Sequence, residues 1–133
     1  MRKLLAAVLC IIIVFWSSCA EEEQSASGTP EDNLIVVGFS QIGAESEWRM
    51  ANTESVKSAL SEENGYMLIF DNARQEQENQ IRAIRMFIQQ DVDYIVFSPN
   101  FETGWNSILL EAKEANIPVI VIDRYIEQQD RDL

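Results

Sequence analysis

The sequence predicts an α/β fold, a parallel sheet with helices in the order βαβαβαβ. From residue 34 onward, four short apolar runs alternate with three longer segments whose apolar residues recur every three or four positions. Strands that alternate with amphipathic helices imply a parallel sheet with right-handed crossovers. Of the 133 residues, 47% are apolar, so the chain can bury the core of one domain.

The first expected strand and helix lie between residues 34 and 64. The run LIVVGFS, residues 34–40, is continuously apolar, as expected for a strand covered on both faces. Gly65 follows a segment, residues 46–64, that has the spacing of an amphipathic helix. Its apolar residues are Trp48, Ala51, Val56, Ala59 and Leu60.

The remaining elements follow the same alternation. Strands are expected at YMLIF (66–70), YIVFS (94–98) and PVIVID (118–123), and Pro118 is tolerated because it opens its strand. Helices are expected over residues 77–90 and 105–116. Their apolar stripes are Ile81, Ile84, Phe87 and Ile88 in the first, and Ile108, Leu109 and Ala112 in the second.

Residues 1–18 have the pattern of an export signal. Arg2 and Lys3 precede an apolar run from Leu4 to Trp16, and small residues follow. That run is shorter than the roughly 20 residues that a membrane-spanning helix needs. Ser17-Ser18-Cys19 resembles the cleavage site of bacterial lipoproteins, in which the cysteine carries lipid, although Trp16 replaces the usual aliphatic residue. The alternatives are ordinary signal cleavage nearby or an uncleaved anchor.

Residues 19–33 are expected to form a lipidated cysteine and a flexible tether, because they are polar, small and acidic. Cys10 leaves with the signal, so Cys19 has no partner for an intrachain disulfide. The protein is therefore expected outside the cytoplasm, either periplasmic or held by lipid at the cell membrane. Residues 34–133 form the folded domain.

Composition excludes several classes of function. The net charge of −12 argues against nucleic-acid binding, and the absence of histidine excludes histidine-based catalysis and metal ligation. There is no phosphate-binding glycine motif, no nucleophile with a base, and no cluster with metal-ligand spacing. The chain is therefore expected to be a binding protein rather than an enzyme, with no cofactor and no metal.

Polar and aromatic residues follow each expected strand. In an open parallel sheet, ligands bind beyond the carboxyl ends of the strands. Carboxylates, amides and arginines there suit a polyhydroxylated ligand, whose hydroxyls donate and accept and whose C–H faces can lie on an indole. On this basis Trp48, Arg49, Asp71, Asp123 and Arg124 are candidate ligand-binding residues, and Ser40 and Glu45 follow the first strand beside them.

Several of these residues also have a structural interpretation. Trp48 could be the first buried residue of its helix, Arg49 could be a solvated arginine near Glu45, and Asp71 could cap the turn after its strand. Asp123 and Arg124 directly follow a β-branched run and could form a structural ion pair instead of a ligand clamp. Trp105, at the start of a helix, is expected to be a packing residue, with ligand binding as the alternative.

Three stretches together resemble the periplasmic sugar-binding proteins of the ribose-binding and lactose-repressor-like type, including galactofuranose-binding members that serve ABC importers. The stretches are VGFSQIGAESEWR, DNARQEQENQIRAIRMFIQQDVDYIVFSPNFETGW and EAKEANIPVIVIDR. The resemblance implies one Rossmann-like lobe of a type I periplasmic-binding-protein fold, the amino-terminal one. It also implies that the five candidate residues above, together with Ser40 and Glu45, contact a monosaccharide.

The resemblance implies a function in sugar uptake. Such a protein captures a sugar, here one like galactofuranose, and delivers it to the membrane subunits of an ABC permease through closure of two lobes about a hinge. Family members are about twice as long as this chain, so we expect a fragment that contains the amino-terminal lobe only.

Other functions remain open at this point. The same lobe could report sugar occupancy to a receptor kinase or a chemoreceptor, and its chemistry does not separate sensing from transport. The effector domain of a repressor shares the fold, but the export signal and the lack of a basic helix-turn-helix argue against it. An enzyme that uses Asp71 or Asp123 as acid or base, or a receiver domain phosphorylated on Asp71, is disfavoured by that signal and by a missing lysine after a later strand.

Overall fold

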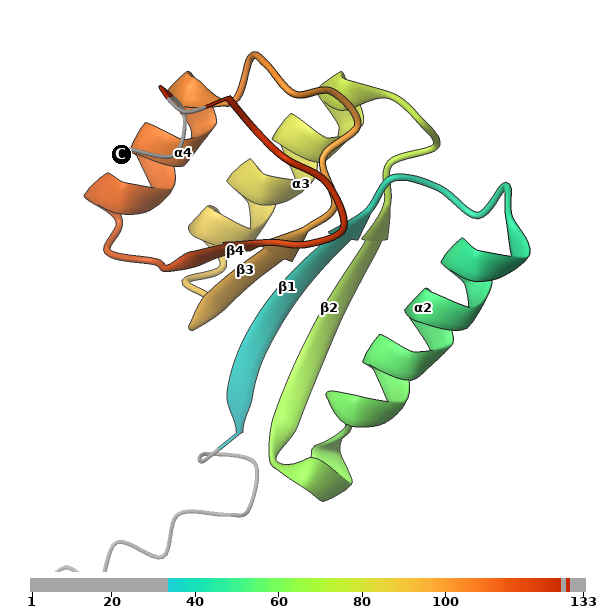
Figure 1. The fold of residues 1–133 in the computed structure, drawn as a ribbon. Helices are drawn as coiled ribbons and strands as arrows, with labels where there is room; N and C mark the ends of the chain where they lie inside the picture. The colour runs from blue at the N-terminus through green and yellow to red at the C-terminus, as the bar shows by residue number, and fades with distance from the viewer. Residues whose placement is uncertain (1–33, 128, 130–133) are drawn as a thin grey trace, which may run out of the picture.

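The computed structural model describes residues 34–127 and 129, which form a four-stranded parallel sheet with helices on both faces (Figure 1). The predicted signal, Cys19 and the predicted tether lie outside the described residues. The strands are β1 Ile35–Gln41, β2 Tyr66–Asn72, β3 Tyr94–Phe97 and β4 Val119–Val121. The helices are α2 Glu47–Ala59, α3 Gln77–Gln89 and α4 Asn106–Glu114, with a 3₁₀ turn, η3, at Glu62–Asn64. The predicted βαβαβαβ order is confirmed.

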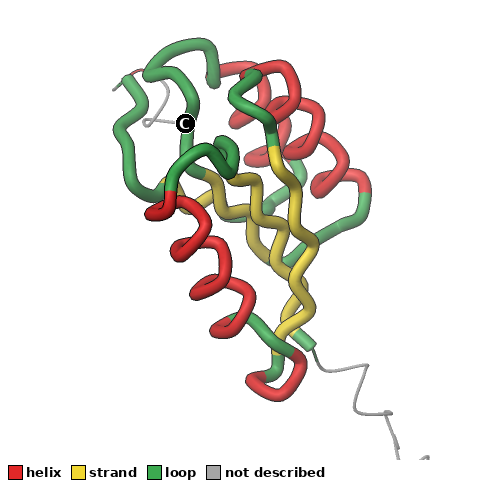
Figure 2. Tube along the Cα trace, turned by 90° about the vertical axis from the view of Figure 1, so that its right-hand side faces the viewer, coloured by secondary structure: helices red, strands yellow, loops and turns green. Residues whose placement is uncertain are grey.

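The strand order in space is β2-β1-β3-β4, so the chain reverses its direction of travel across the sheet after β2. Right-handed crossovers then require the first connecting helix on one face and the next two on the other. Figures 1 and 2 show this arrangement, with α2 on one side of the sheet and α3 and α4 on the other.

The core lies between the sheet and the helices α3 and α4. Ile84 and Phe87 of α3 and Ile95 and Phe97 of β3 are fully buried there. Phe87 lies so close to β1 that a Cβ atom at Gly38 would clash with its ring, so this strand position requires glycine. Trp105 is buried as well, with its ring centroid 4.8 Å from that of Phe97, as expected for a packing residue.

The helix expected over residues 46–64 is shorter in the structure, and its expected burial is wrong. Helix α2 ends at Ala59, and the 3₁₀ turn then leads to Gly65, whose φ of 85° lies in the left-handed region that favours glycine. No residue of α2 is buried, because among the described elements it is alone on its face of the sheet and solvent reaches both of its flanks.

The ends of the strands also differ from the expected ranges. Strand β1 is shifted by one residue from the expected 34–40, and β2 extends two residues further than expected, so that Ser40 pairs with Asp71 and Gln41 with Asn72 in register. Strand β4 is shorter than residues 118–123, because the chain turns sharply at Asp123. In residues 34–127 and 129, no helix is long and apolar enough to cross a membrane.

Candidate functional site

The carboxyl ends of the four strands meet at one edge of the sheet, at the top of Figure 1. The connections that leave β1 and β3 go to opposite faces of the sheet, which makes the boundary between these two strands a topological switch point. Crevices at such points are the usual ligand sites of open α/β sheets. Five of the seven predicted site residues belong to the ends of strands or to the loops that follow them at this edge, and the other two, Trp48 and Arg49, lie in the first turn of α2.

A row of polar side chains crosses the ends of all four strands. Asp71 accepts a hydrogen bond from the Ser40 hydroxyl at 3.4 Å, and Asp123 accepts one from the Ser98 hydroxyl at 3.2 Å. The two halves are joined by the Ser98 N–H, which donates to the Ser40 carbonyl at 3.3 Å. We call Asp71, Ser40, Ser98 and Asp123 the polar row. It places one carboxylate at each end of a line of hydroxyls.

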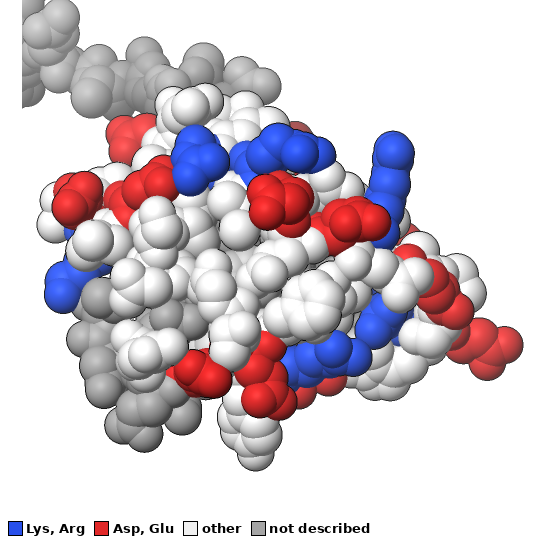
Figure 3. Space-filling model, turned by 90° about the horizontal axis from the view of Figure 1, so that it is seen from above, with Lys and Arg blue, Asp and Glu red and all other residues white. Residues whose placement is uncertain are grey.

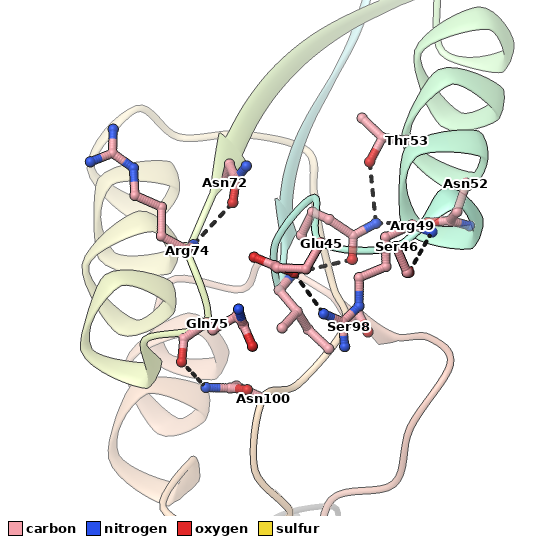
Figure 4. A network of polar contacts seen from close by, with 12 residues as sticks. Glu45, Ser46, Arg49, Asn52, Thr53, Asn72, Arg74, Gln75, Ser98 and Asn100 are labelled. Atoms are coloured by element: carbon pink, nitrogen blue, oxygen red, sulfur yellow. Dashed lines mark hydrogen bonds and ion pairs between the residues drawn. The ribbon is translucent and has the colours of Figure 1, made fainter.

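The loop between β2 and α3 is held in an uncommon backbone conformation. Arg74 and Gln75 have φ values of 53° and 63°, in the left-handed region that ordinary residues rarely adopt. The Gln75 N–H donates to the Ile42 carbonyl at 2.7 Å, and the Gln75 carbonyl accepts from the Asn100 side chain (Figure 4). Strained conformations of this kind persist where the surroundings hold them, and they cluster at binding sites.

Asp123 and Arg124 form a tight turn directly after β4. Asp123 has a φ of 69°, and the Arg124 N–H donates to the Ile122 carbonyl at 2.8 Å, which closes a three-residue γ-turn. The Arg124 side chain donates to the Asn100 carbonyl at 3.3 Å, whereas its Nε lies 4.0 Å from the Asp123 carboxylate. The two side chains are thus anchored mainly on the loop after β3, by Ser98 and Asn100, and only loosely on each other.

The loop after β1 presents Glu45 and Arg49. Ser46 caps α2 by accepting from the Arg49 N–H at 3.2 Å. Arg49 Nη1 lies 2.8 Å from Glu45 Oε2, and only 17% of the Arg49 side chain is exposed, so it is less solvated than a typical surface arginine (Figure 4). The Glu45 carboxylate folds over Gly43, where a Cβ atom would clash with it.

The electrostatics of this loop favour ionised groups. Partial desolvation acts to raise the pKa of Glu45, but hydrogen bonds from backbone N–H groups and from Arg49 outweigh it and lower that pKa below its ordinary value. The Glu45 carboxylate is therefore ionised throughout the neutral range.

Trp48 projects into solvent at the start of α2. Its exposed fraction is 54%, so the interpretation of Trp48 as the first buried residue of its helix is wrong. A large exposed indole beside Arg49 at a sheet edge is available to stack against a ligand.

Asp71 has the opposite electrostatic setting from Glu45. Burial raises the pKa of Asp71, and the hydrogen bond from Ser40 and the charges of Arg74 and Arg82 only partly offset this. The capping alternative for Asp71 is not what the structure shows, because its neighbour Asn72 accepts from the Arg74 N–H at 3.0 Å. Asp71 also lines a cavity of about 290 Å³ with Arg74, Arg82 and Met86, on the β2 side of the edge.

Viewed from above, this edge has an uncharged centre flanked by basic and acidic side chains (Figure 3). The described residues contain no group of three or more acidic or cysteine side chains that could hold a metal ion. An edge with two anchored carboxylates, two arginines, hydroxyls and an exposed indole can bind a neutral, hydroxyl-rich molecule by bidentate hydrogen bonds and stacking.

Three residues outside the predicted set take part in the site. Ser98 accepts from Gln80 through its carbonyl and donates to Asp123 through its hydroxyl, and the Asn100 carbonyl accepts from Arg124. Gln80 is fully buried in α3 on the same stripe as Ile84 and Phe87. An amide on an apolar helical stripe is the signal that could have found it, because a buried amide needs partners.

The fold and this edge define a ligand-binding lobe of the open α/β type, and the comparisons agree. The chain belongs to the family of periplasmic binding protein domains, which matches residues 37–133. Membership of this family indicates an extracytoplasmic location and a binding role.

Known relatives support a sugar-binding class. The chain is 48% identical over 99 residues to the galactofuranose-binding protein YtfQ of Escherichia coli, and this match covers 74% of this chain and 31% of that protein. It is 58% identical to a Mycobacterium smegmatis protein solved with β-D-fucofuranose, with a TM-score of 0.70 and coverage of 74% and 32%. A Shewanella arabinose-binding protein solved with α- and β-L-arabinofuranose is 51% identical, with a TM-score of 0.67 and coverage of 69% and 30%. The chain thus spans about a third of the length of these relatives.

Proposed function

We propose that this protein contributes one lobe of an extracytoplasmic receptor that binds a monosaccharide in its furanose form for an ABC importer, without catalysis. The observation that carries the proposal is the polar row, together with Arg124, Arg49 and the exposed Trp48 at the same edge. The furanose preference rests on relatives named for galactofuranose or solved with fucofuranose and arabinofuranose.

Each predicted residue then has a role at this edge. The Trp48 indole covers one face of the sugar ring, and Arg49, oriented by Glu45, donates to its hydroxyls. Asp123 and Arg124 hold neighbouring ring hydroxyls, one by accepting and the other by donating. Ser40 and Asp71 contact the remaining hydroxyls from the β1 and β2 side.

The proposal extends to the parts of the chain outside the described residues. Residues 1–18 act as the export signal, Cys19 carries lipid, residues 20–33 act as a tether, and the folded lobe starts at residue 34. The lipid holds the lobe at the membrane surface, where the permease subunits take the sugar.

Sugar titration of variants tests the site. Protein is produced from the native gene, at whatever length the cell makes it, and is titrated by calorimetry with D-galactose and L-arabinose, whose solutions contain the furanose forms. We expect Trp48→Ala and Arg124→Ala each to weaken binding by at least tenfold, since each removes a stacking platform or a charge-assisted contact of about 1.4 kcal/mol or more.

The matched control is Met50→Ala. Met50 lies in the same turn of α2 as Trp48 and is 49% exposed, but it points to another side of the helix. Its substitution should leave affinity within twofold. Equal affinity in wild type, Trp48→Ala and Arg124→Ala would remove the site assignment, and no binding of either sugar by the wild type would remove the proposed function.

The anchor is tested by intact mass. The membrane fraction should contain protein that begins at Cys19 and carries the extra mass of a lipid, and Cys19→Ala should move the protein out of that fraction. Membrane retention of Cys19→Ala with an intact amino terminus would favour an uncleaved anchor instead.

A further inference from the structure

Gln80 connects the core to the candidate site. Its side chain is fully buried in the first turns of α3, beside the loop that follows β3. Its Nε2 donates to the Ser98 carbonyl at 2.7 Å, and its Oε1 accepts from the Asn100 N–H at 2.9 Å. The side-chain amide therefore pairs with the backbone as a neighbouring strand would.

Gln80 forms hydrogen bonds to the backbone on both sides of Pro99. Proline has no N–H, so the Ser98 carbonyl and the Asn100 N–H are the backbone groups on either side of it that can be held. Pro99 is itself buried. Gln80 thus ties the segment 98–100 to helix α3, in addition to the bonds that the Ser98 N–H makes to Ser40 and the Asn100 side chain makes to Gln75.

The segment 98–100, which Gln80 holds, also anchors the side chains of Asp123 and Arg124. Asp123 accepts from the Ser98 hydroxyl at 3.2 Å, and Arg124 donates to the Asn100 carbonyl at 3.3 Å. The γ-turn fixes the backbone of Asp123 and Arg124, but their side chains lie 4.0 Å apart, so the spacing of the two side chains depends on these anchors.

We propose that Gln80 is a positioning residue of the sugar site, which sets the spacing between Asp123 and Arg124 through its two hydrogen bonds to Ser98 and Asn100. The inference rests on the proposed function, because it assigns Gln80 a role in the affinity of that same site. Preorganised contacts bind better because less conformational entropy is lost on binding.

The test compares Gln80→Met with Gln77→Met. Methionine keeps the length of the side chain and removes both hydrogen bonds. Gln77 is the matched control, since it lies one turn earlier in α3 and donates to the carbonyl of Thr103 at 2.7 Å in the same loop. Neither Asp123 nor Arg124 has a hydrogen bond to Thr103 in the described residues.

The first readout is independent of sugar. ¹⁵N relaxation of the ligand-free protein reports fast motion at the Arg124 Nε–H and at the backbone amides of Asn100 and Asp123. We expect order parameters at these positions to fall in Gln80→Met and to stay at the wild-type level in Gln77→Met. Equal order in the two variants would overturn the inference.

The second readout is affinity for D-galactose, with protein made from the native gene as above. Gln80→Met should weaken binding by at least tenfold, and Gln77→Met by less than twofold. Unchanged affinity in Gln80→Met, in a wild type that binds, overturns the positioning role and leaves the proposed function intact. A wild type that binds no sugar removes the proposed function. In that case the order parameters alone test whether Gln80 positions Asp123 and Arg124.

A third variant covers the case in which Gln80→Met fails to fold. In Gln80→Glu, a protonated carboxyl group can donate to Ser98 and accept from Asn100, whereas an ionised one loses the donor. Burial favours the neutral form of such a carboxyl group. Order at Arg124, relative to wild type at the same pH, should therefore be near normal at about pH 5 and reduced at about pH 8. If the order parameter at Arg124 in Gln80→Glu equalled that of the wild type at both pH values, the proposal would be contradicted.

Discussion

The carboxylates at this edge lie in different electrostatic environments, and their pKa values shift in opposite directions. Glu45 lies beside Arg49 and backbone N–H groups, which lower its pKa, whereas burial raises the pKa of Asp71. Folding thus favours the ionised form of Glu45 and the neutral form of Asp71. The ionised form of Asp71 is therefore destabilised by its burial. Hydrogen bonds from the hydroxyl groups of a bound ligand can offset this destabilisation.

Replacing Asp71 by asparagine should stabilise the ligand-free protein near neutral pH. Because the folded pKa of Asp71 is raised, its contribution to stability is complete below the ordinary aspartate pKa and is lost as pH rises through the raised value. Asp71→Asn removes this loss, so we expect its melting temperature to rise by roughly 1–4 °C at pH 7. The gain should vanish below about pH 4.

Melting curves by circular dichroism between pH 3 and pH 7 measure this effect. Glu114→Gln is the control, since it removes the same charge from an exposed position of α4 in a chain whose net charge is −12. A gain of the same size in Glu114→Gln would attribute the effect to relief of net charge rather than to burial of Asp71.

At the scale of elements, α2 and α3 contribute in different ways. Helix α3 buries Gln80, Ala83, Ile84 and Phe87, so the core fixes its position. Helix α2 buries no residue, yet it carries Trp48 and Arg49 in its first turn. The buried Gln41 amide donates to Asn52 and Thr53 of α2 at 2.9 and 3.3 Å, and the first turn that carries the two site residues depends in addition on its amino-terminal cap.

Ser46, the N-cap of α2, should contribute more to the stability of that helix than the serines inside it. Ser46→Ala removes the acceptor for the Arg49 N–H and should cost about 0.5–2 kcal/mol of helix stability. Because α2 has little packing to compensate, its first turn should fray, and hydrogen exchange of its amides should speed up several-fold while that of α3 stays unchanged.

Ser55→Ala is the control for this prediction. Ser55 lies inside the same helix, where alanine is the better helix former by only a few tenths of a kcal/mol. Its amides should exchange no faster than those of the wild type. Faster exchange throughout α3 in Ser46→Ala would mean that the cap supports the whole lobe and not the helix alone.

At the scale of the whole molecule, the two faces of the sheet are covered unequally. Helices α3 and α4 cover one face, and α2 covers only part of the other. Ile95, Val119 and Val121 belong to the core, so strand alternation directs their neighbours Tyr94 and Ile120 to the α2 face. Their exposed fractions are 41% and 47%.

This exposed apolar area should bind a hydrophobic dye. We expect the folded chain to enhance the fluorescence of anilinonaphthalene sulfonate, and the double substitution Tyr94→Thr/Ile120→Thr to reduce the signal by at least half. Leu110→Thr, at a 40% exposed position of α4 on the opposite face, should change it little. An equal loss of signal in Leu110→Thr would show that the dye does not discriminate between the faces.

Local patterns along the chain were sufficient to predict the elements and the edge at which the candidate residues gather. Strand and helix periods are local properties, and the carboxyl ends of parallel strands must lie together, so Ser40, Asp71 and Asp123 could be assigned to one edge without coordinates. The same local signals overestimated α2, because apolar spacing indicates which face of a helix is apolar but not whether another element covers it.

The hydrogen-bond partners that meet at that edge depend on how the elements pack together. The bonds from Ser98 to Asp123, from Arg124 to Asn100 and from Gln80 to the segment between them join residues 18 to 25 positions apart. Such contacts depend on strand order, register and the turn at Asp123, which are properties of the packed sheet rather than of any local stretch. A buried amide such as Gln80 can be recognised from the sequence as needing partners, but the fold alone decides which partners it finds.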